Sequence, residues 1–120
     1  MITTKHVYEP ISTEDGTLFL VDRLWPRGMK KERLEGVVWI KELGPSTDLR
    51  HWFNHDPEKW DQFKERYFVE LEAKQALLTP IQEAAKKGRV TLLFATKEEE
   101  HNNAVALKEY LEPKFPTFCN

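Results

Sequence analysis

The stretch VTLLFA, residues Val90–Ala95, is the part of the sequence that decides the fold. It is an almost continuous apolar run, and Gly88 just before it is typical of the end of a helix. Uninterrupted apolar runs of this length are typical of strands in parallel sheets, because helices cover both faces of such sheets. We therefore expect Val90–Ala95 to be a buried strand with parallel neighbours.

Three shorter segments are predicted to supply the other strands. Thr17–Leu24 (TLFLVDRL) and Val37–Ile40 (VVWI) are rich in the β-branched and aromatic residues that strands favour. Lys5–Tyr8 gives a weaker strand signal. Because Glu14–Gly16 (EDG) has the composition of a tight turn, we expect the first two strands to form a hairpin.

The segments between the second strand and the last one are predicted to be helical. Lys30–Leu34 is a candidate helical turn, and Gly44-Pro45-Ser46 precedes a short helix through Leu49–Phe53. Asp56 before Pro57 is typical of a helix start. The helix that follows carries an apolar face, which we interpret as core rather than as a cofactor site, made of Trp60, Phe63, Tyr67 and Leu71.

Two capping patterns predict where later helices begin. Thr79-Pro80-Ile81-Gln82 has the form of a capping box, so we expect the long helix to break and restart there. Thr96 with Glu99 is expected to cap a last helix that turns Ala104, Leu107 and Leu111 inward. After Pro113 we expect irregular structure.

This order of elements predicts an α/β fold: a single layered domain, residues 1–120, with a small mostly parallel sheet flanked by helices. The net charge of −2 favours neither nucleic acid nor an acidic membrane as a partner. No segment approaches the roughly 20 apolar residues of a membrane span. The single cysteine, Cys119, excludes an intramolecular disulfide and fits a cytoplasmic location.

Polar residues follow the predicted strands at their carboxyl ends, where ligands bind in open α/β sheets. Asp22, Arg23, Trp25 and Arg27 follow one strand, and Thr96 and Lys97 follow another. Ser46 and Arg50 come after the third strand, and Asn102 and Asn103 come near the start of the last helix. We expect these residues to form one polar rim.

Three arginines in this set indicate an anion site, because guanidinium groups match carboxylate and phosphate oxygens. The candidate ligand-binding residues are Arg23, Trp25, Arg27, Ser46, Arg50, Asn102 and Asn103. The alternative is that Arg23 pairs with Asp22 or another carboxylate and that Arg27 is merely solvated. Trp25 is interpreted either as a stacking residue or as a lid on the core.

Catalytic residues are not identified by any motif. Asp22 and His101 are candidates for proton transfer, and Ser46 is a candidate nucleophile if a histidine reaches it. His51 and His55 have the spacing of a metal pair, but HWFNHD lacks the glutamate of a zinc motif, so we predict no metal. No nucleotide-binding glycine motif is present, and we expect no cofactor.

VDRLWPRG at residues 21–28, WIKELGPSTDLR at 39–50 and VTLLFATKEEEHNNA at 90–104 together resemble the YeaO-like family of bacterial proteins, a domain of unknown function. The resemblance implies a small cytoplasmic α/β domain and does not imply a reaction. The family-like polar positions are Asp22, Arg23, Arg27, Ser46, Arg50, Tyr67, Asn102 and Asn103. The family often has a second histidine in the stretch that here contains Asn103, which weakens a histidine-pair mechanism.

Three functional hypotheses follow. The first is an enzyme or binding domain for a small phosphorylated or carboxylated ligand. The second is a non-enzymatic nucleic-acid or regulatory module built on Trp25 and the basic residues from Arg27 to Arg33, although nucleic acid is disfavoured by the acidic chain. The third is a partner-binding protein whose arginines form internal salt bridges. Four tryptophans in 120 residues leave room for a homodimer face.

Overall fold

The computed structural model describes residues 1–112 and contains a four-stranded parallel sheet with the strand order β1-β4-β2-β3. The strands are β1 (Ile2–His6), β2 (Thr17–Leu20), β3 (Val38–Trp39) and β4 (Val90–Phe94). The predicted α/β fold with a small, mostly parallel sheet is confirmed. Cys119 and the predicted irregular tail after Pro113 lie outside the described residues.

β4 is a central strand, as its apolar sequence predicts. It pairs in parallel with β1, from Ile2 opposite Val90 to His6 opposite Phe94. On its other side it pairs in parallel with β2, and all five of its residues are buried. An apolar strand in this position stabilises the fold through burial on both faces of the sheet.

The predicted hairpin between the first two strands is wrong, because β1 and β2 each pair in parallel with β4 and not with each other. The connection between them contains a 3-10 turn, Thr13–Asp15, which Ser12 caps. Gly16 then adopts a φ of 73° and passes so close to the backbone of Arg89 that a Cβ atom would lie 2.1 Å from the Arg89 carbonyl oxygen. The Asp-Gly pair therefore aligns β2 with β4 rather than reversing the chain.

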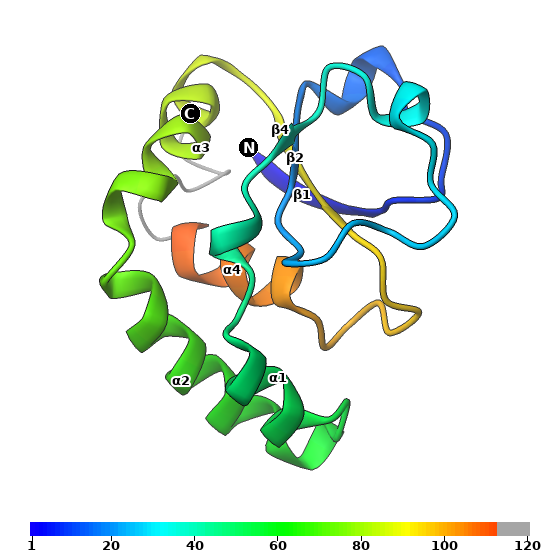
Figure 1. Ribbon diagram of the computed structural model, residues 1–120. Helices are drawn as coiled ribbons and strands as arrows, with labels where there is room; N and C mark the ends of the chain where they lie inside the picture. The colour runs from blue at the N-terminus through cyan, green and yellow to red at the C-terminus, as the bar shows by residue number, and fades with distance from the viewer. Residues whose placement is uncertain (113–120) are drawn as a thin grey trace.

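Two helices, α3 (Gln75–Lys87) and α4 (Asn103–Leu111), lie against one face of the sheet, while α2 (Trp60–Glu72) packs on α4 and α1 (Thr47–Phe53) packs on α2 (Figure 1). Side chains of all four pack with the inward residues of the sheet in the larger core. The opposite face is covered mainly by the connection from β2 to β3, residues 21–37. Met29 and Leu34 from this connection pack against Leu18, Leu20 and Leu93.

Helix boundaries follow capping residues, two of which the sequence analysis placed wrongly. Asp56 caps a 3-10 turn, Pro57–Lys59, that leads into α2, as expected. The break before α3 lies at Ala73–Lys74 instead of Thr79, so Pro80 is inside the second turn of α3. Burial of Leu78 and Ile81 stabilises the turns on both sides of that proline.

The last helix begins later than predicted. Its cap is Asn102, whose Oδ1 accepts the backbone N–H of Val105 at 2.9 Å, and not Thr96. Thr96 instead accepts the N–H of Glu98, and the Glu98 carboxylate accepts the N–H groups of Glu100 and His101. These bonds turn the chain between β4 and α4, and they lower the pKa of Glu98. The loop shapes the site described next.

Candidate functional site

A cavity of about 390 Å³ lies at the carboxyl ends of β2 and β4. From these neighbouring strands the chain departs to opposite faces of the sheet. After β2 it forms the 21–37 connection, and after β4 it continues to α4 on the helical face. Such a divergence creates a crevice, which is where open α/β sheets bind their ligands.

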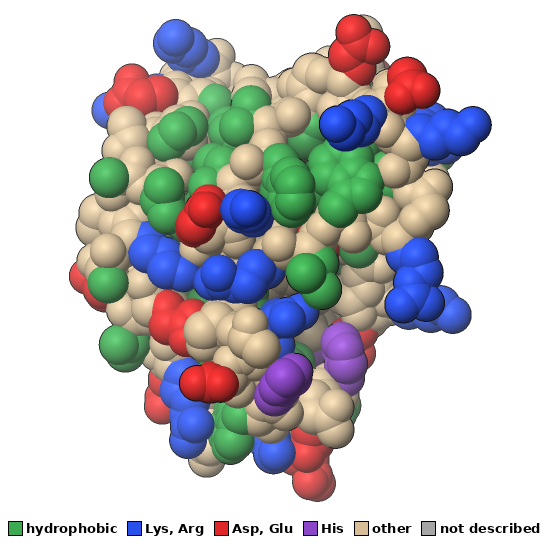
Figure 2. All heavy atoms as spheres, in the orientation of Figure 1, with side chains coloured by type: hydrophobic (Ala, Val, Ile, Leu, Met, Phe, Trp, Pro, Cys, Tyr) green, Lys and Arg blue, Asp and Glu red, His purple; other side chains and the backbone are tan. Residues whose placement is uncertain are grey.

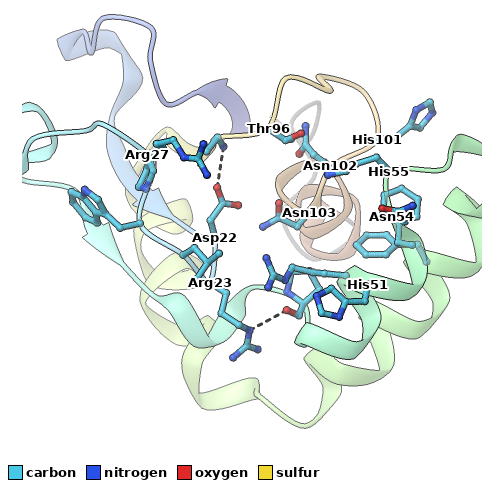
Figure 3. Close-up of a pocket in the computed structure, with 18 residues that line it drawn as sticks. Asp22, Arg23, Arg27, His51, Asn54, His55, Thr96, His101, Asn102 and Asn103 are labelled. Carbon is cyan, nitrogen blue, oxygen red and sulfur yellow. Dashed lines mark hydrogen bonds between the residues drawn. The ribbon is translucent and has the colours of Figure 1, made fainter.

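Four segments line the cavity, and Figure 3 shows them around it with Asp22 and Asn103 directed inward. The connection after β2 contributes Asp22 to Arg27. The start and end of α1 contribute Pro45, Arg50, His51, Phe53, Asn54 and His55, and α2 adds Phe63. The connection after β4 contributes Ala95, Thr96, His101, Asn102 and Asn103. Figure 2 shows histidine and Lys or Arg side chains close together on the lower half of one face of the molecule.

Asp22 directs its carboxyl group into this cavity (Figure 3). Its Oδ2 accepts the backbone N–H of Ala95 at 2.9 Å. Burial raises its pKa, and the raising is opposed by the Asn103 side chain, by the hydrogen bond from Ala95 and by the charges of Arg50 and His6. The polar groups and charges around Asp22 therefore offset only part of the cost of burying its ionised form.

Arg27 and Arg50 bring to the cavity two guanidinium groups that have no hydrogen-bond or ion-pair partner within residues 1–112. The Nε of Arg50 is buried and has no acceptor in this part of the chain. The Arg27 side chain is exposed, and neither guanidinium forms a hydrogen bond or an ion pair with a residue in the described range 1–112. A buried N–H without an acceptor is costly. Because the Nε is closed off, an anion in the cavity would meet the other nitrogens of the Arg50 guanidinium group.

Arg23 lines the same cavity but its guanidinium is already occupied. Its Nε donates to the Pro45 carbonyl at 3.0 Å, and Nη2 donates to the Gly44 carbonyl at 2.9 Å (Figure 3). The alternative in which Arg23 pairs with Asp22 is wrong, because its acceptors are backbone carbonyls. Arg23 thus ties the end of β2 to the segment that leads into α1.

Ser46 is not brought to this cavity. Its Oγ accepts the N–H of Leu49, which caps α1, and donates to the Glu70 carboxylate at 2.6 Å. Glu70 also accepts the backbone N–H of Ser46 at 2.8 Å. No histidine among the described residues hydrogen-bonds to Ser46, which therefore lacks the base that a serine nucleophile needs.

Trp25 lines the cavity with part of its ring and packs with the rest against the smaller core. Its Nε1 donates to the Met29 carbonyl at 2.8 Å, and its ring meets the edge of Trp39 with centroids 5.3 Å apart. This position fits the interpretation of Trp25 as a lid on the core. It also leaves an apolar wall on the Arg27 side of the cavity.

The two asparagines at the start of α4 line the cavity, and both have partners within the fold. Asn102 is buried, and it donates to the Glu98 carbonyl in addition to capping α4. The Nδ2 of Asn103 donates to the Val21 carbonyl at 2.8 Å, which joins α4 to the end of β2. Asn103 therefore helps to position Asp22.

Three histidines surround the cavity, and no cluster of three or more metal-ligating side chains occurs in the described part of the chain. The ring centroids of His101 and Trp60 lie 5.0 Å apart in an edge-on contact. The buried Nδ1 of His101 lies 3.6 Å from a Glu98 carboxylate oxygen, and it has no hydrogen-bond partner within residues 1–112. Unlike Arg50, His101 therefore has a carboxylate oxygen within ion-pair distance.

The sequence analysis missed Asn54, which lines the cavity beside His55 where α1 ends. Both residues adopt left-handed backbone conformations, with φ values of 47° and 55°. Asparagine after an amphipathic segment is a recognised signal for this kind of helix end. The signal was present in HWFNHD, and it predicts the turn that carries these side chains to the cavity.

The fold and the site define a class: an α/β domain with an arginine-containing polar cavity between two diverging parallel strands. Residues 1–117 match the family model described as the inactive DUF488-N3 subclade, and the chain belongs to this family. It is 40% identical over 110 residues to the uncharacterized protein YeaO of Escherichia coli K12, covering 92% of this chain and 96% of that protein.

Mycobacterial relatives confirm the same family. The uncharacterized proteins Rv3073c of Mycobacterium tuberculosis H37Rv and Mb3100c of Mycobacterium bovis are each 36% identical over 110 residues, 92% of this chain and 92% of theirs. The resemblance to YeaO-like proteins is therefore confirmed.

No solved structure matches the chain. Within residues 1–112, no helix is long and apolar enough to cross a membrane.

Proposed function

We propose that this chain is a binding domain for a small phosphorylated or carboxylated ligand, which Arg27 and Arg50 hold in the cavity between β2 and β4. The observation that carries the proposal is the Arg50 guanidinium, which lines the cavity and has no hydrogen-bond acceptor or ion-pair partner among residues 1–112. A phosphate or carboxylate oxygen in the cavity supplies an acceptor for the guanidinium group and compensates its charge.

The size and lining of the cavity support a ligand of metabolite size. Its volume of about 390 Å³ falls in the range of small-molecule sites, which combine an apolar wall with a few polar groups. Trp25, Phe53 and Phe63 supply apolar surface, and the two free guanidinium groups supply directional donors.

Binding without turnover is the form of the proposal that the family description favours, since the matching subclade is described as inactive. The residues agree with this description. Asp22 and His101 both line the cavity, but no hydrogen bond joins them among the described residues. Ser46, the candidate nucleophile, lies outside the cavity and is bonded to Glu70.

Thermal unfolding in the presence of phosphates, nucleotides and small carboxylates tests the proposal. A ligand at ten times its Kd stabilises the folded state by about 1.4 kcal/mol, which raises the midpoint by roughly 4–7 °C for a domain of this size. Arg27→Ala is expected to lose this shift. Arg33→Ala removes another exposed arginine, outside the cavity, and is expected to retain it. The absence of a shift with every compound in the wild type would contradict the proposal.

A second candidate function, association with a protein partner or a second copy of the chain, is favoured by three exposed apolar side chains. Leu24 is 63% exposed, and Val38 and Trp39 on the edge strand β3 are 45% and 39% exposed. Sedimentation of the wild type and of Leu24→Glu tests self-association. A dimer that the substitution dissociates supports it, and a monomer at high concentration in both proteins contradicts it.

A further inference from the structure

We propose that Asp22 selects the ligand, so that the cavity prefers an anion with a hydroxyl or ammonium group beside its anionic group over an anion without such a donor. This inference rests on the proposed function, because it concerns the ligand of the same cavity. It starts from the composition of the lining. Asp22 is the one acidic side chain among the described residues that surround the cavity, which Arg27 and Arg50 also line.

The position of the Asp22 carboxyl group is fixed. Its Oδ2 accepts the N–H of Ala95 at 2.9 Å, and the Asn103 side chain lies close enough to lower its pKa. Asn103 is itself held by the Val21 carbonyl at 2.8 Å. Figure 3 shows Asp22 directed into the cavity together with Asn103. The carboxyl group cannot turn away from a ligand without breaking the bond that joins the segment after β2 to the end of β4.

Its hydrogen-bonding capacity is only partly used. A carboxylate offers about four acceptor sites. Among the described residues one hydrogen bond reaches the Asp22 carboxylate, from the N–H of Ala95. No ion pair joins it to Arg27, Arg50 or any other cation within residues 1–112. The direction of its pKa shift agrees, because burial disfavours the ionised group more than its neighbours compensate it. The acceptor sites that remain are available to a donor in the cavity.

A plain anion bound to the guanidinium groups meets a like charge at Asp22, which weakens binding in a partly buried site. A ligand that places a hydroxyl or an ammonium group on Asp22 turns this repulsion into a hydrogen bond. Sites with a buried polar group discriminate strongly against analogues that leave it unpaired. Arg27 and Arg50 therefore provide attraction, and Asp22 provides specificity.

Three phosphate esters of matched length test the inference: ethyl phosphate, 2-hydroxyethyl phosphate and O-phosphoethanolamine. They differ only in the terminal hydrogen, hydroxyl or ammonium group. Calorimetric titration of the wild-type chain is expected to give an affinity at least about tenfold lower for ethyl phosphate than for the better of the other two. The order of those two shows whether the donor is a hydroxyl or an ammonium group.

Asp22→Asn is expected to change the affinities for the two kinds of ligand in opposite directions. The variant loses the negative charge, so ethyl phosphate binds more tightly than to the wild type. The donor-bearing ligand binds more weakly, and the preference falls below about twofold. Asp61→Asn, which removes the same charge from a side chain that is 92% exposed on α2, is expected to leave all three affinities unchanged.

Equal affinity of the wild type for the three esters overturns the inference and leaves the anion site standing. An undiminished preference in a folded Asp22→Asn variant also overturns it. Binding of none of the three at millimolar concentration overturns the proposed function for phosphate esters, and the inference with it. If Asp22→Asn does not fold, the wild-type comparison still decides, because it needs no variant.

Discussion

Two groups of polar side chains lie close together in this fold and differ in how completely they are paired. At the junction of α1 and α2, Ser46 and Glu70 share two hydrogen bonds, and Tyr67 donates to the Leu43 carbonyl at 2.5 Å. Arg23 completes this junction through two carbonyls, Gly44 and Pro45. Every one of these side chains has a partner in the protein.

In the cavity the pattern is the opposite. Arg27 and Arg50 have no acceptor among the described residues, and the Nδ1 of His101 is buried without a hydrogen bond. Asp22 is held by the N–H of Ala95 yet remains poorly compensated. Paired polar groups stabilise a fold, whereas unpaired buried ones cost stability and persist where a ligand uses them. The comparison therefore separates structural residues from the proposed binding residues, and substitutions in the two groups are expected to behave differently.

The largest effect on stability is expected at the junction. Glu70→Ala removes the acceptor for both the N–H and the hydroxyl of Ser46, so the start of α1 loses its connection to α2. Two hydrogen bonds to a carboxylate are together worth roughly 2–3 kcal/mol. Urea denaturation measures the loss. Glu65→Ala on the exposed side of α2 is the matched control and is expected to change stability by less than about 0.5 kcal/mol. Equal stability of the two variants would show that the Ser46–Glu70 contact is not a stabilising one.

Tyr67→Phe is expected to have a smaller effect in the same direction. The ring is buried in the core, and burial raises the pKa of the phenol, so its hydroxyl stays protonated as a donor to Leu43. Phenylalanine keeps the packing and leaves the carbonyl unpaired, which costs about 1–2 kcal/mol. Denaturant unfolding gives the size of the loss, and ligand-induced thermal shifts are expected to be those of the wild type. A lost thermal shift would mean that the junction and the cavity are coupled.

In the cavity, Asp22→Asn is expected to raise the stability of the protein rather than lower it. The folded-state pKa of Asp22 is raised, so the folded protein binds its proton more readily than the unfolded chain does. This contribution favours the folded state at low pH and is lost as the pH rises through the raised pKa. Asparagine avoids the ionisation, so the variant is expected to be more stable than the wild type at pH 7. The gain disappears below about pH 4, where the unfolded carboxyl is also protonated.

Thermal unfolding from pH 4 to pH 8 measures this difference. The slope of stability against pH is expected to be less negative in Asp22→Asn than in the wild type, because the variant lacks the titrating group. Asp61→Asn, at an exposed position, serves as the charge-matched control. A variant that is less stable than the wild type at pH 7 would show that the hydrogen bond from Ala95 and the nearby Asn103 side chain outweigh the cost of burial.

The sequence predicts those parts of the fold that depend on burial and fails where the partners are distant along the chain. Apolar periodicity predicts β4 and the buried face of α2, because burial decides where those residues lie. Strand pairing depends on partners that are distant in sequence, so the local Asp-Gly turn wrongly predicts a hairpin between β1 and β2. Carboxyl-terminal strand ends predict that Asp22, Arg27 and Asn103 lie around one cavity, since parallel strands deliver them to the same edge.

What the sequence does not distinguish is a paired arginine from an unpaired one. Arg23 and Arg50 are both half-buried arginines that line the cavity, and both were candidates for the same role. The difference arises from the Gly44–Pro45 backbone, whose carbonyls meet Arg23 after the chain has folded. Ser46 illustrates the same limit, because its partner Glu70 is 24 residues away on another helix. Such partners are brought together only by the tertiary fold, so the spacing of residues along the chain does not predict them.

The smallest effect on stability is expected from Arg27→Ala, although its effect on binding is expected to be large. The Arg27 side chain is exposed and unpaired within the described residues, so its removal changes the free energy of unfolding by no more than about 0.5 kcal/mol. The loop itself keeps its anchor, because Tyr8 donates its hydroxyl to the backbone carbonyl of Arg27 at 2.6 Å, which the substitution retains. Urea denaturation without ligand, beside the ligand-induced thermal shift, measures the two quantities separately. A loss of stability close to that of Glu70→Ala would place Arg27 with the structural group, and the distinction between paired and unpaired arginines would then fail at the residue where it is easiest to test.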